Sequence, residues 1–436
     1  MTALQRHLGV GGATLVGLSA MIGAGVFYVW APAAQAAGSG LLIALLLAAT
    51  LATLNALSST QLAMAYPVSG GAYAFGRATL GPTWGFAAGW MFLAGKTASA
   101  GALALIMGSY LWPEHARTVA VAAVVLLAAV NAAGIRSTAR VSTVVVVVVL
   151  GGLAAVIAAG VAAVVAGAGA GAGGAVPGSV LSLDTLTDAG APGLLQAAGL
   201  LFFCFAGYAR MATLGEEVRD PRCTLPRAIF TALGVALALY FTIAVLLVAV
   251  LGPERLAASA SPIADLLAAV GAGLPGEVLV RVVATVACLG SLMGILAGLS
   301  RTGLAMARER DLPGPLGRIA TRTGAPVVAE ASMALVAIVG IVLLDPARLV
   351  GFSACTVLVY YAIAHLAALR QPASERWLPR ALPVVGLAGC LVLAVTLPWP
   401  SVVGAAVWLL LGLLLRGIRL RTDARAAAVA AVQPTG

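Results

Sequence analysis

The sequence contains little charge. Only 9% of its 436 residues are Asp, Glu, Lys or Arg, whereas 61% are hydrophobic. A soluble domain of this size could not bury so much apolar surface, so the mean hydropathy of +1.06 indicates a protein whose solvent is lipid. We expect an all-α integral membrane protein of the plasma membrane, because helices satisfy their own backbone hydrogen bonds in lipid.

Residues that carry metal, redox or hydrolytic chemistry are also scarce. The five cysteines lie in or beside apolar segments without a CxxC pair, and the three histidines are scattered. Such cysteines are small buried apolar residues, so the pattern predicts no disulfide framework, no metal site and no cofactor. No His/Asp/Glu cluster and no Ser–His–Asp set falls at a common depth, which argues against an enzyme.

Lysine is almost absent. The net charge of +10 arises from 24 arginines and the single lysine Lys96. The arginines form short clusters between apolar runs, which indicates membrane topology and argues against nucleic acid as a partner. With the N-terminus inside, twenty arginines lie on the inner side, and the four outside are Arg117, Arg255, Arg281 and Arg348. Both termini are therefore predicted to be cytoplasmic.

Long apolar runs, by contrast, are abundant. Runs of about 17–25 residues are long enough to cross a bilayer, and the sequence contains twelve of them. They cover residues 11–35, 39–64, 84–111, 117–134, 140–166, 193–217, 224–251, 276–307, 326–344, 347–369, 379–397 and 399–416. Residues 167–192 form a predicted extracellular loop rich in Gly and Ala, and residues 417–436 a predicted cytoplasmic tail.

Glycines interrupt two of these spans. Gly23 and Gly25 lower helix propensity in the middle of span one, and Gly207 lies among aromatic residues in span six. A helix broken inside the membrane presents free N–H groups that favour a carboxylate. A simpler explanation is that the glycines only allow two helices to pack closely. Paired interruptions in corresponding spans favour a transporter built from inverted repeats.

Several motifs together resemble the amino acid–polyamine–organocation superfamily of amino acid permeases. They are Ile22–Phe27, Tyr66–Tyr73, Asn131–Arg136, the span-six stretch through Glu216, Glu217 and Pro226, and Ala305–Asp311. The resemblance implies a leucine-transporter-like fold with five-plus-five inverted repeats and broken helices 1 and 6. Residues 1–166 would form the first repeat, 193–369 the second, and 370–416 two peripheral spans.

The resemblance also implies a substrate site at the two interruptions. The amides of Gly23–Gly25 would receive the substrate carboxylate, and carbonyls near Met21, Phe203 and Ala206 its amino group. This agrees with the electronegative C-terminal end of a half-helix. The full set of expected substrate-binding residues is Met21, Ile22, Gly23, Ala24, Gly25, Phe203, Phe205, Ala206 and Gly207.

The sequence departs from the family at the coupling residue. Many similar permeases carry a lysine in span five, where this chain has Val149. Lys96 instead lies in the middle of span three, about 12 residues from the nearer end of that span, and each residue of a helix adds about 1.5 Å to this distance. An intramembrane lysine is costly and usually functional. It could instead extend to an interface or pair with Glu114. We expect Lys96, Tyr208 and Arg210 to serve coupling or gating.

These observations predict a sodium-independent, proton-coupled transporter that moves an amino acid by alternating access. Its expected partners are an amino acid, protons and the lipid bilayer. A neutral amino acid is favoured because no acidic residue lies near the predicted pocket to pair with a cationic side chain. An acidic substrate remains open because Lys96 is positive. The competing functions are those of an exchanger or exporter, a channel, and a nutrient sensor on a transporter-like fold.

Overall fold

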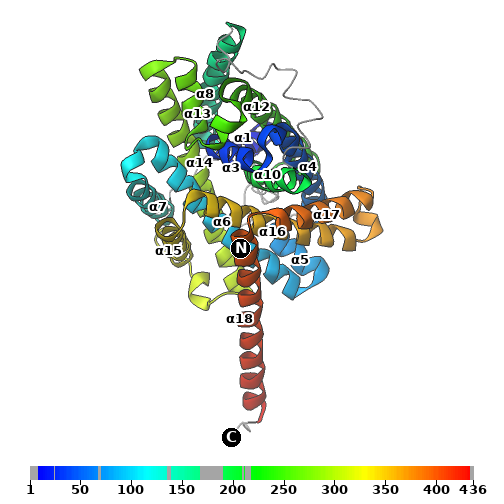
Figure 1. Ribbon diagram of the computed structural model, residues 1–436. Coiled ribbons are helices and arrows are strands. Elements are labelled where there is room, and N and C mark those ends of the chain that lie inside the picture. Colours follow the sequence, from blue (N-terminus) through cyan, green and yellow to red (C-terminus); the bar gives the residue numbers. More distant parts are fainter. Residues whose placement is uncertain are drawn as a thin grey trace.

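The computed structural model describes residues 8–23, 25–66, 70–134, 139–166, 190–208, 211 and 218–432. This part of the chain is a bundle of helices (Figure 1). The described residues form no β-sheet, and Leu8 and Val218 make only an isolated bridge. The expectation of an all-α protein is therefore confirmed.

The helices follow the predicted apolar runs closely. In the first half they are α1 (Val10–Met21), α2 (Gly25–Tyr28), α3 (Trp30–Ala37), α4 (Leu41–Ala65), α5 (Ala72–Leu80), α6 (Pro82–Leu111), α7 (Ala116–Ala132) and α8 (Ala139–Val165). In the second half they are α10 (Gly190–Phe205), α12 (Pro221–Ala257), α13 (Pro262–Ala269), α14 (Gly273–Arg308), α15 (Val327–Leu343), α16 (Pro346–Arg370), α17 (Ala381–Thr396) and α18 (Trp399–Val432).

Ten helical segments among the described residues are long and apolar enough to cross a membrane. Two further apolar helices, α15 and α17, have 17 and 16 residues. Every predicted span coincides with one of these helices or with a broken pair. A multi-pass membrane protein is thus confirmed, while twelve crossings and an inverted repeat stay predictions.

Two helices extend beyond the predicted spans. Helix α10 begins at Gly190, so residues 190–192 of the predicted loop are helical. Helix α18 does not end at residue 416 but continues to Val432. Hydropathy identifies only the part of a helix that is apolar enough to lie in lipid. The alanine-rich C-terminal end of α18 is helical because alanine has a high intrinsic helix propensity. Residues 212–217 of predicted span six lie outside the described chain.

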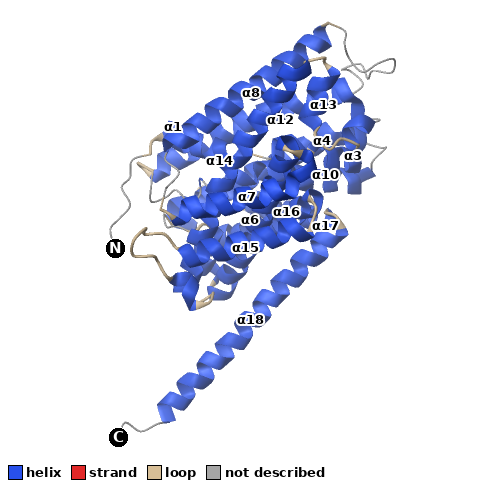
Figure 2. Cartoon of the chain, turned by 90° about the vertical axis from the view of Figure 1, so that its left-hand side faces the viewer, coloured by secondary structure: helices blue, strands red, loops and turns tan. Residues whose placement is uncertain are grey.

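The interior of the bundle is organised around α6. In its most apolar window 94% of the residues are buried, against 17% for α18. Helices α14 and α16 pack against α6, and α16 also packs against α4, α10 and α17. The last turns of α18 extend away from the other helices (Figure 2). Side chains that belong to a site inside the bundle must therefore reach it from α6 and its neighbours.

Candidate functional site

The first helix is broken where the glycines predict it. Helix α1 ends at Met21, and Ile22 leaves the helix with ψ of 70°. The N–H of Gly23 turns back and donates to Met21 O at 2.9 Å. Helix α2 begins at Gly25 and continues almost directly into α3, because Val29 N bonds to Gly25 O. Ala24 lies outside the described residues.

The sixth predicted span is also interrupted. Its α-helix, α10, ends at Phe205, and the 3₁₀ turn η3 (Ala206–Tyr208) follows. Gly207 lies in the middle of this turn. The predicted coupling residue Arg210 lies outside the described residues. The break in span one and the end of the α-helix at Phe205 in span six lie where the interruptions were predicted.

The two breaks touch each other in a reciprocal way. Gly25, just after the first break, packs on Cys204, just before the second, and a Cβ at Gly25 would lie 3.1 Å from Cys204 Cα. Conversely, Gly207 in the second break packs on the backbone of Ala20 and Met21 before the first. The helix end that precedes each break therefore contacts the break of the other span. This arrangement is typical of two broken helices that run antiparallel.

These contacts give the glycines a packing role. A side chain at Gly25 would meet the Sγ of Cys204 at 2.8 Å, and one at Gly23 would meet the Ser291 Oγ at 2.5 Å. Valine at Gly25 would therefore displace α10 itself, and an effect on substrate would not isolate carboxylate binding. Close helix packing at these glycines is directly supported, whether or not their amides also bind substrate.

Lys96 reaches the second break from α6. Its Nζ donates to Ala206 O at 3.1 Å, and the residue is 8% exposed. The carbonyls at the end of α10 carry partial negative charge, which favours an ammonium there. The two alternative predictions for Lys96, that its side chain extends to a membrane interface or pairs with Glu114, are both wrong in this structure. The Lys96 side chain points inward to η3, and Glu114 is exposed in the turn η2 (Pro113–His115).

Tyr240 on α12 connects the two breaks, although it is not among the site residues predicted from the sequence. Its hydroxyl lies 2.8 Å from Met21 O and 3.3 Å from Cys204 O, the last turns before each interruption. Its ring makes edge contacts with Phe205 and Trp30. A tyrosine inside the apolar run 224–251 was the available signal, because a buried phenol needs a hydrogen-bond partner.

The aromatic residues of the second break are packed inside the protein. Phe205 and Tyr208 are fully buried, and Phe203 is 9% exposed. Tyr208 stacks on Tyr361 of α16 with ring centroids 5.2 Å apart. Met21, Ile22 and Ala206 are also buried, so the predicted site residues that the structure describes come together in a closed, tightly packed arrangement.

Gly207→Ala is expected to abolish transport, because its Cβ would overlap the Ala20 backbone, which cannot rotate away. Overpacking of this kind costs about 1–3 kcal/mol or more. Gly234→Ala on α12 is the matched control, since nothing lies within 4 Å of its Cβ. Transport by purified protein in liposomes measures both. A wild-type transport rate for Gly207→Ala would show that transport does not require close contact between Gly207 and the Ala20 backbone.

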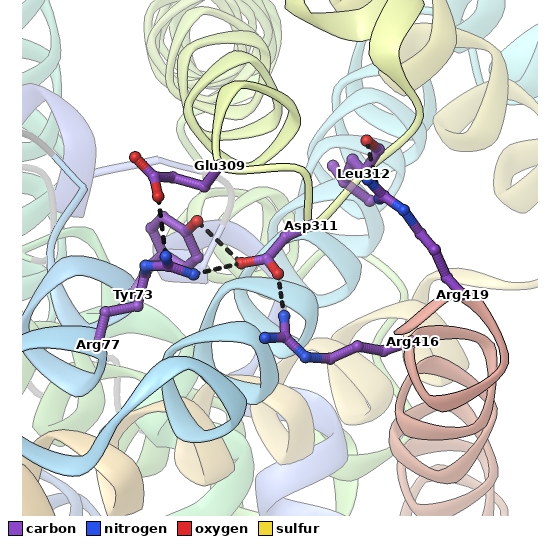
Figure 3. Close-up of polar contacts among 7 residues, drawn as sticks. All are labelled: Tyr73, Arg77, Glu309, Asp311, Leu312, Arg416 and Arg419. Atoms are coloured by element: carbon purple, nitrogen blue, oxygen red, sulfur yellow. Dashed lines mark hydrogen bonds and ion pairs between the residues drawn. The ribbon is translucent and has the colours of Figure 1, made fainter. Parts of the chain in front are cut away.

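A charged cluster that was not predicted as a site lies at the end of the bundle expected to be cytoplasmic (Figure 3). Asp311, which follows α14, accepts hydrogen bonds from Tyr73 at 3.0 Å and Arg77 at 2.9 Å, and from Arg416 of α18. Arg77 also pairs with Glu309 at 2.8 Å. The Asp311 carboxylate therefore joins α5, α14 and α18.

Tyr73 keeps its proton around neutral pH. Burial raises the pKa of Tyr73 to about 12, against the smaller lowering effect of Arg77. The phenol therefore remains a proton donor to Asp311 throughout the physiological range. Arg416 is further held by the ring of Phe86, 4.9 Å from its guanidinium carbon.

Comparison with known proteins identifies the family of this chain. The profile of a family described as amino acid permease matches residues 8–414. The chain belongs to the amino acid permease family. Its membership in the amino acid–polyamine–organocation superfamily, expected from the motifs, is confirmed, and it is a membrane transporter rather than an enzyme.

Relatives of this permease extend over most of its length. An uncharacterized transporter of Mycobacterium tuberculosis is 48% identical over 416 residues, covering 95% of this chain and 92% of the relative. The branched-chain amino acid permease of Bacillus subtilis is 28% identical, with the same two coverages. The serine/threonine exchanger of Bacillus subtilis is 24% identical over 84% of this chain and 83% of its own length.

Proposed function

We propose that this permease is a secondary transporter that binds an amino acid between the two broken helices and carries it by alternating access. The observation that carries the proposal is the reciprocal contact of Gly25 with Cys204 and of Gly207 with Ala20. Antiparallel broken helices of this kind support a five-plus-five inverted repeat, residues 1–166 and 193–369, around a midplane site. The proposed location is the plasma membrane, with both termini inside.

In this proposal the two breaks supply opposite partial charges. The N–H groups at the start of α2 face the substrate carboxylate, and carbonyls at the end of α10 face its ammonium. Lys96 already occupies one of these carbonyls, Ala206 O. Opening of the site would therefore change the hydrogen bond between Lys96 and Ala206 O. Lys96 is the proposed coupling or gating charge.

A neutral amino acid is the proposed substrate. Uncharged hydroxyls donate to carbonyls on both sides of the first break: those of Tyr240 and Ser291 on α1, and that of Tyr110 on α2. A cationic side chain would find no described anion among these contacts. Two relatives are named for branched-chain amino acids and for serine and threonine, all of which are neutral.

Exchange is the second candidate function, and a specific observation favours it. One relative is named an exchanger and aligns with 84% of this chain. Net uptake into empty liposomes requires no internal substrate, whereas an obligate exchanger transports only into liposomes loaded with amino acid. The two assays on the same purified protein separate the two modes.

Uptake in choline buffer is expected to equal uptake in sodium buffer. The ammonium of Lys96 lies at the second break, where it can take the role of a bound cation, and a second cation nearby would be repelled. Initial rates of amino acid uptake into liposomes measure this, with potassium buffer as a control for ionic strength. Strict sodium dependence would contradict the proposal and leave Lys96 a structural role only.

A further inference from the structure

A second group of polar side chains is buried among α4, α16 and α17, behind η3. At its centre is His365 of α16, which is fully buried. Its Nε2 lies 2.6 Å from Oδ1 of Asn55 on α4, and Sγ of Cys390 on α17 lies 3.3 Å from the same oxygen. The three helices pack against one another (Figure 1). The proposed transport cycle uses none of these side chains.

The hydrogen bonds define the protonation of the imidazole. With Oδ1 of Asn55 facing the ring, Nε2 of His365 is the donor and the Cys390 thiol is a second donor to the same oxygen, while Nδ2 of Asn55 has no partner among the described residues. The other ring nitrogen, Nδ1, is then a bare acceptor. It is buried and has no hydrogen-bond partner in the part of the chain that the structure describes. His365 thus has one position at which a further proton can bind.

This cluster is continuous with the second break. Tyr361 lies four residues before His365, on the same face of α16. The ring of Tyr361 stacks on Tyr208 of η3, with an angle of 26° between the rings. Both hydroxyls are buried, and the hydroxyl of Tyr208 faces the side chains of Tyr361 and Asn55. Movement of η3 therefore changes the environment of His365 through one pair of rings.

The surroundings of the imidazole do not stabilise a positive charge. The ring packs edge-on against Gly386, where a Cβ would overlap Cε1. No described carboxylate contacts the ring, so an imidazolium enclosed in this way would have no opposite charge to stabilise it. Asn55 of α4 and Gly386 of α17 contact the ring, and both are uncharged. The titratable groups next to them are Cys390, which shares the Asn55 oxygen, and the stacked pair of Tyr361 and Tyr208.

We propose that His365 is a proton-binding switch that controls the movement of η3. The neutral imidazole holds the cluster closed around Tyr208, as the structure shows. Binding of a proton at Nδ1 creates a charge that the closed cluster does not stabilise, so the protonated form favours an arrangement in which the cluster opens to water. Because the two equilibria are linked, acid shifts the population toward a mobile second break.

Titration of the imidazole tests the switch directly. The chain has only three histidines, so ¹⁵N-histidine labelling of the full-length protein in lipid nanodiscs gives few signals. His7→Gln and His115→Gln variants assign them. We expect His365 to show the neutral Nε2–H form at neutral pH and the imidazolium form in acid. In a second sample with ¹³C-labelled tyrosine, the tyrosine ring signals should change at the same pH. A His365 that stays neutral throughout, or titrates without any change in the tyrosines, would overturn the proposal.

Exchange without a gradient gives the functional test, and this arm rests on the proposed transport function. With equal pH on both sides, the wild-type rate is expected to rise as pH falls, by up to about tenfold per pH unit while His365 is mostly neutral. His365→Gln keeps an amide donor for Asn55 but cannot bind the proton, so its rate should rise much less than that of the wild type over the same range. The matched control is His115→Gln, since His115 is exposed in η2.

The outcomes separate this proposal from the transport proposal. If His365→Gln keeps the acid response of the wild type, the switch is wrong while transport stands. If wild-type protein exchanges no amino acid at all, the transport proposal fails, and the imidazole titration alone decides the switch. Loss of the acid response in both His365→Gln and His115→Gln would also contradict an assignment to His365.

Discussion

Replacing Lys96 by methionine is expected to abolish substrate accumulation driven by a pH gradient while leaving the protein inserted. Coupling of one proton to each substrate molecule lets a gradient of one pH unit drive about tenfold accumulation. Methionine has a similar length but cannot donate to Ala206 O, which Lys96 holds at 3.1 Å. Accumulation of labelled amino acid in acid-outside liposomes, compared between wild type and variant, measures the loss.

Lys96→Arg is the matched control for this variant. Arginine keeps a positive charge and a donor for Ala206 O but does not release its proton at physiological pH. If Lys96 carries the coupled proton, both variants lose accumulation. If it acts as a fixed gating charge, arginine preserves transport and methionine does not. Accumulation by Lys96→Met at the wild-type level and pH profile would contradict both roles.

Asp311→Asn is expected to destabilise the folded protein more than any other single substitution in the charged cluster. The Asp311 side chain is 4% exposed and is shared by Arg77 and Arg416, so removal of its charge leaves two guanidinium groups facing each other. Breaking a buried ion pair by removal of one partner costs about 3–5 kcal/mol. Thermal unfolding of purified protein in detergent should therefore show a clear fall in the melting temperature.

Glu309→Gln provides the comparison in the same cluster. The Glu309 side chain is 54% exposed and pairs with Arg77 at the edge of the cluster. Exposed ion pairs contribute about 0–1 kcal/mol, so the melting temperature should hardly change. Equal small effects of both substitutions would show that Asp311 does not connect α5, α14 and α18 energetically.

Features that depend on local sequence could be predicted. Apolar runs indicated the helices, and glycine propensity indicated both interruptions, because hydropathy and helix propensity act within a few residues. The inward direction of Lys96 followed from its distance to either membrane surface. The family resemblance pointed to Asp311 within a motif, but not to its three partners.

Pairings between distant residues could not be predicted. Tyr240 and Met21 are 219 residues apart in the chain, and His365 and Asn55 are 310 apart. Nothing in the residues around Tyr240 or His365 indicates its partner, since the contact depends on how whole helices pack. For the same reason the packing role of Gly25 against Cys204 became visible only in the structure.

The most direct test of the central claim is whether the permease recognises the free carboxylate of a neutral amino acid. A ligand that binds only the folded protein stabilises it by about 2.7 kcal/mol at a hundred times its dissociation constant. We predict that at least one neutral amino acid raises the melting temperature of the purified protein, and that its methyl ester at the same concentration does not. Equal stabilisation by acid and ester, or none by any amino acid, would contradict binding at the paired breaks.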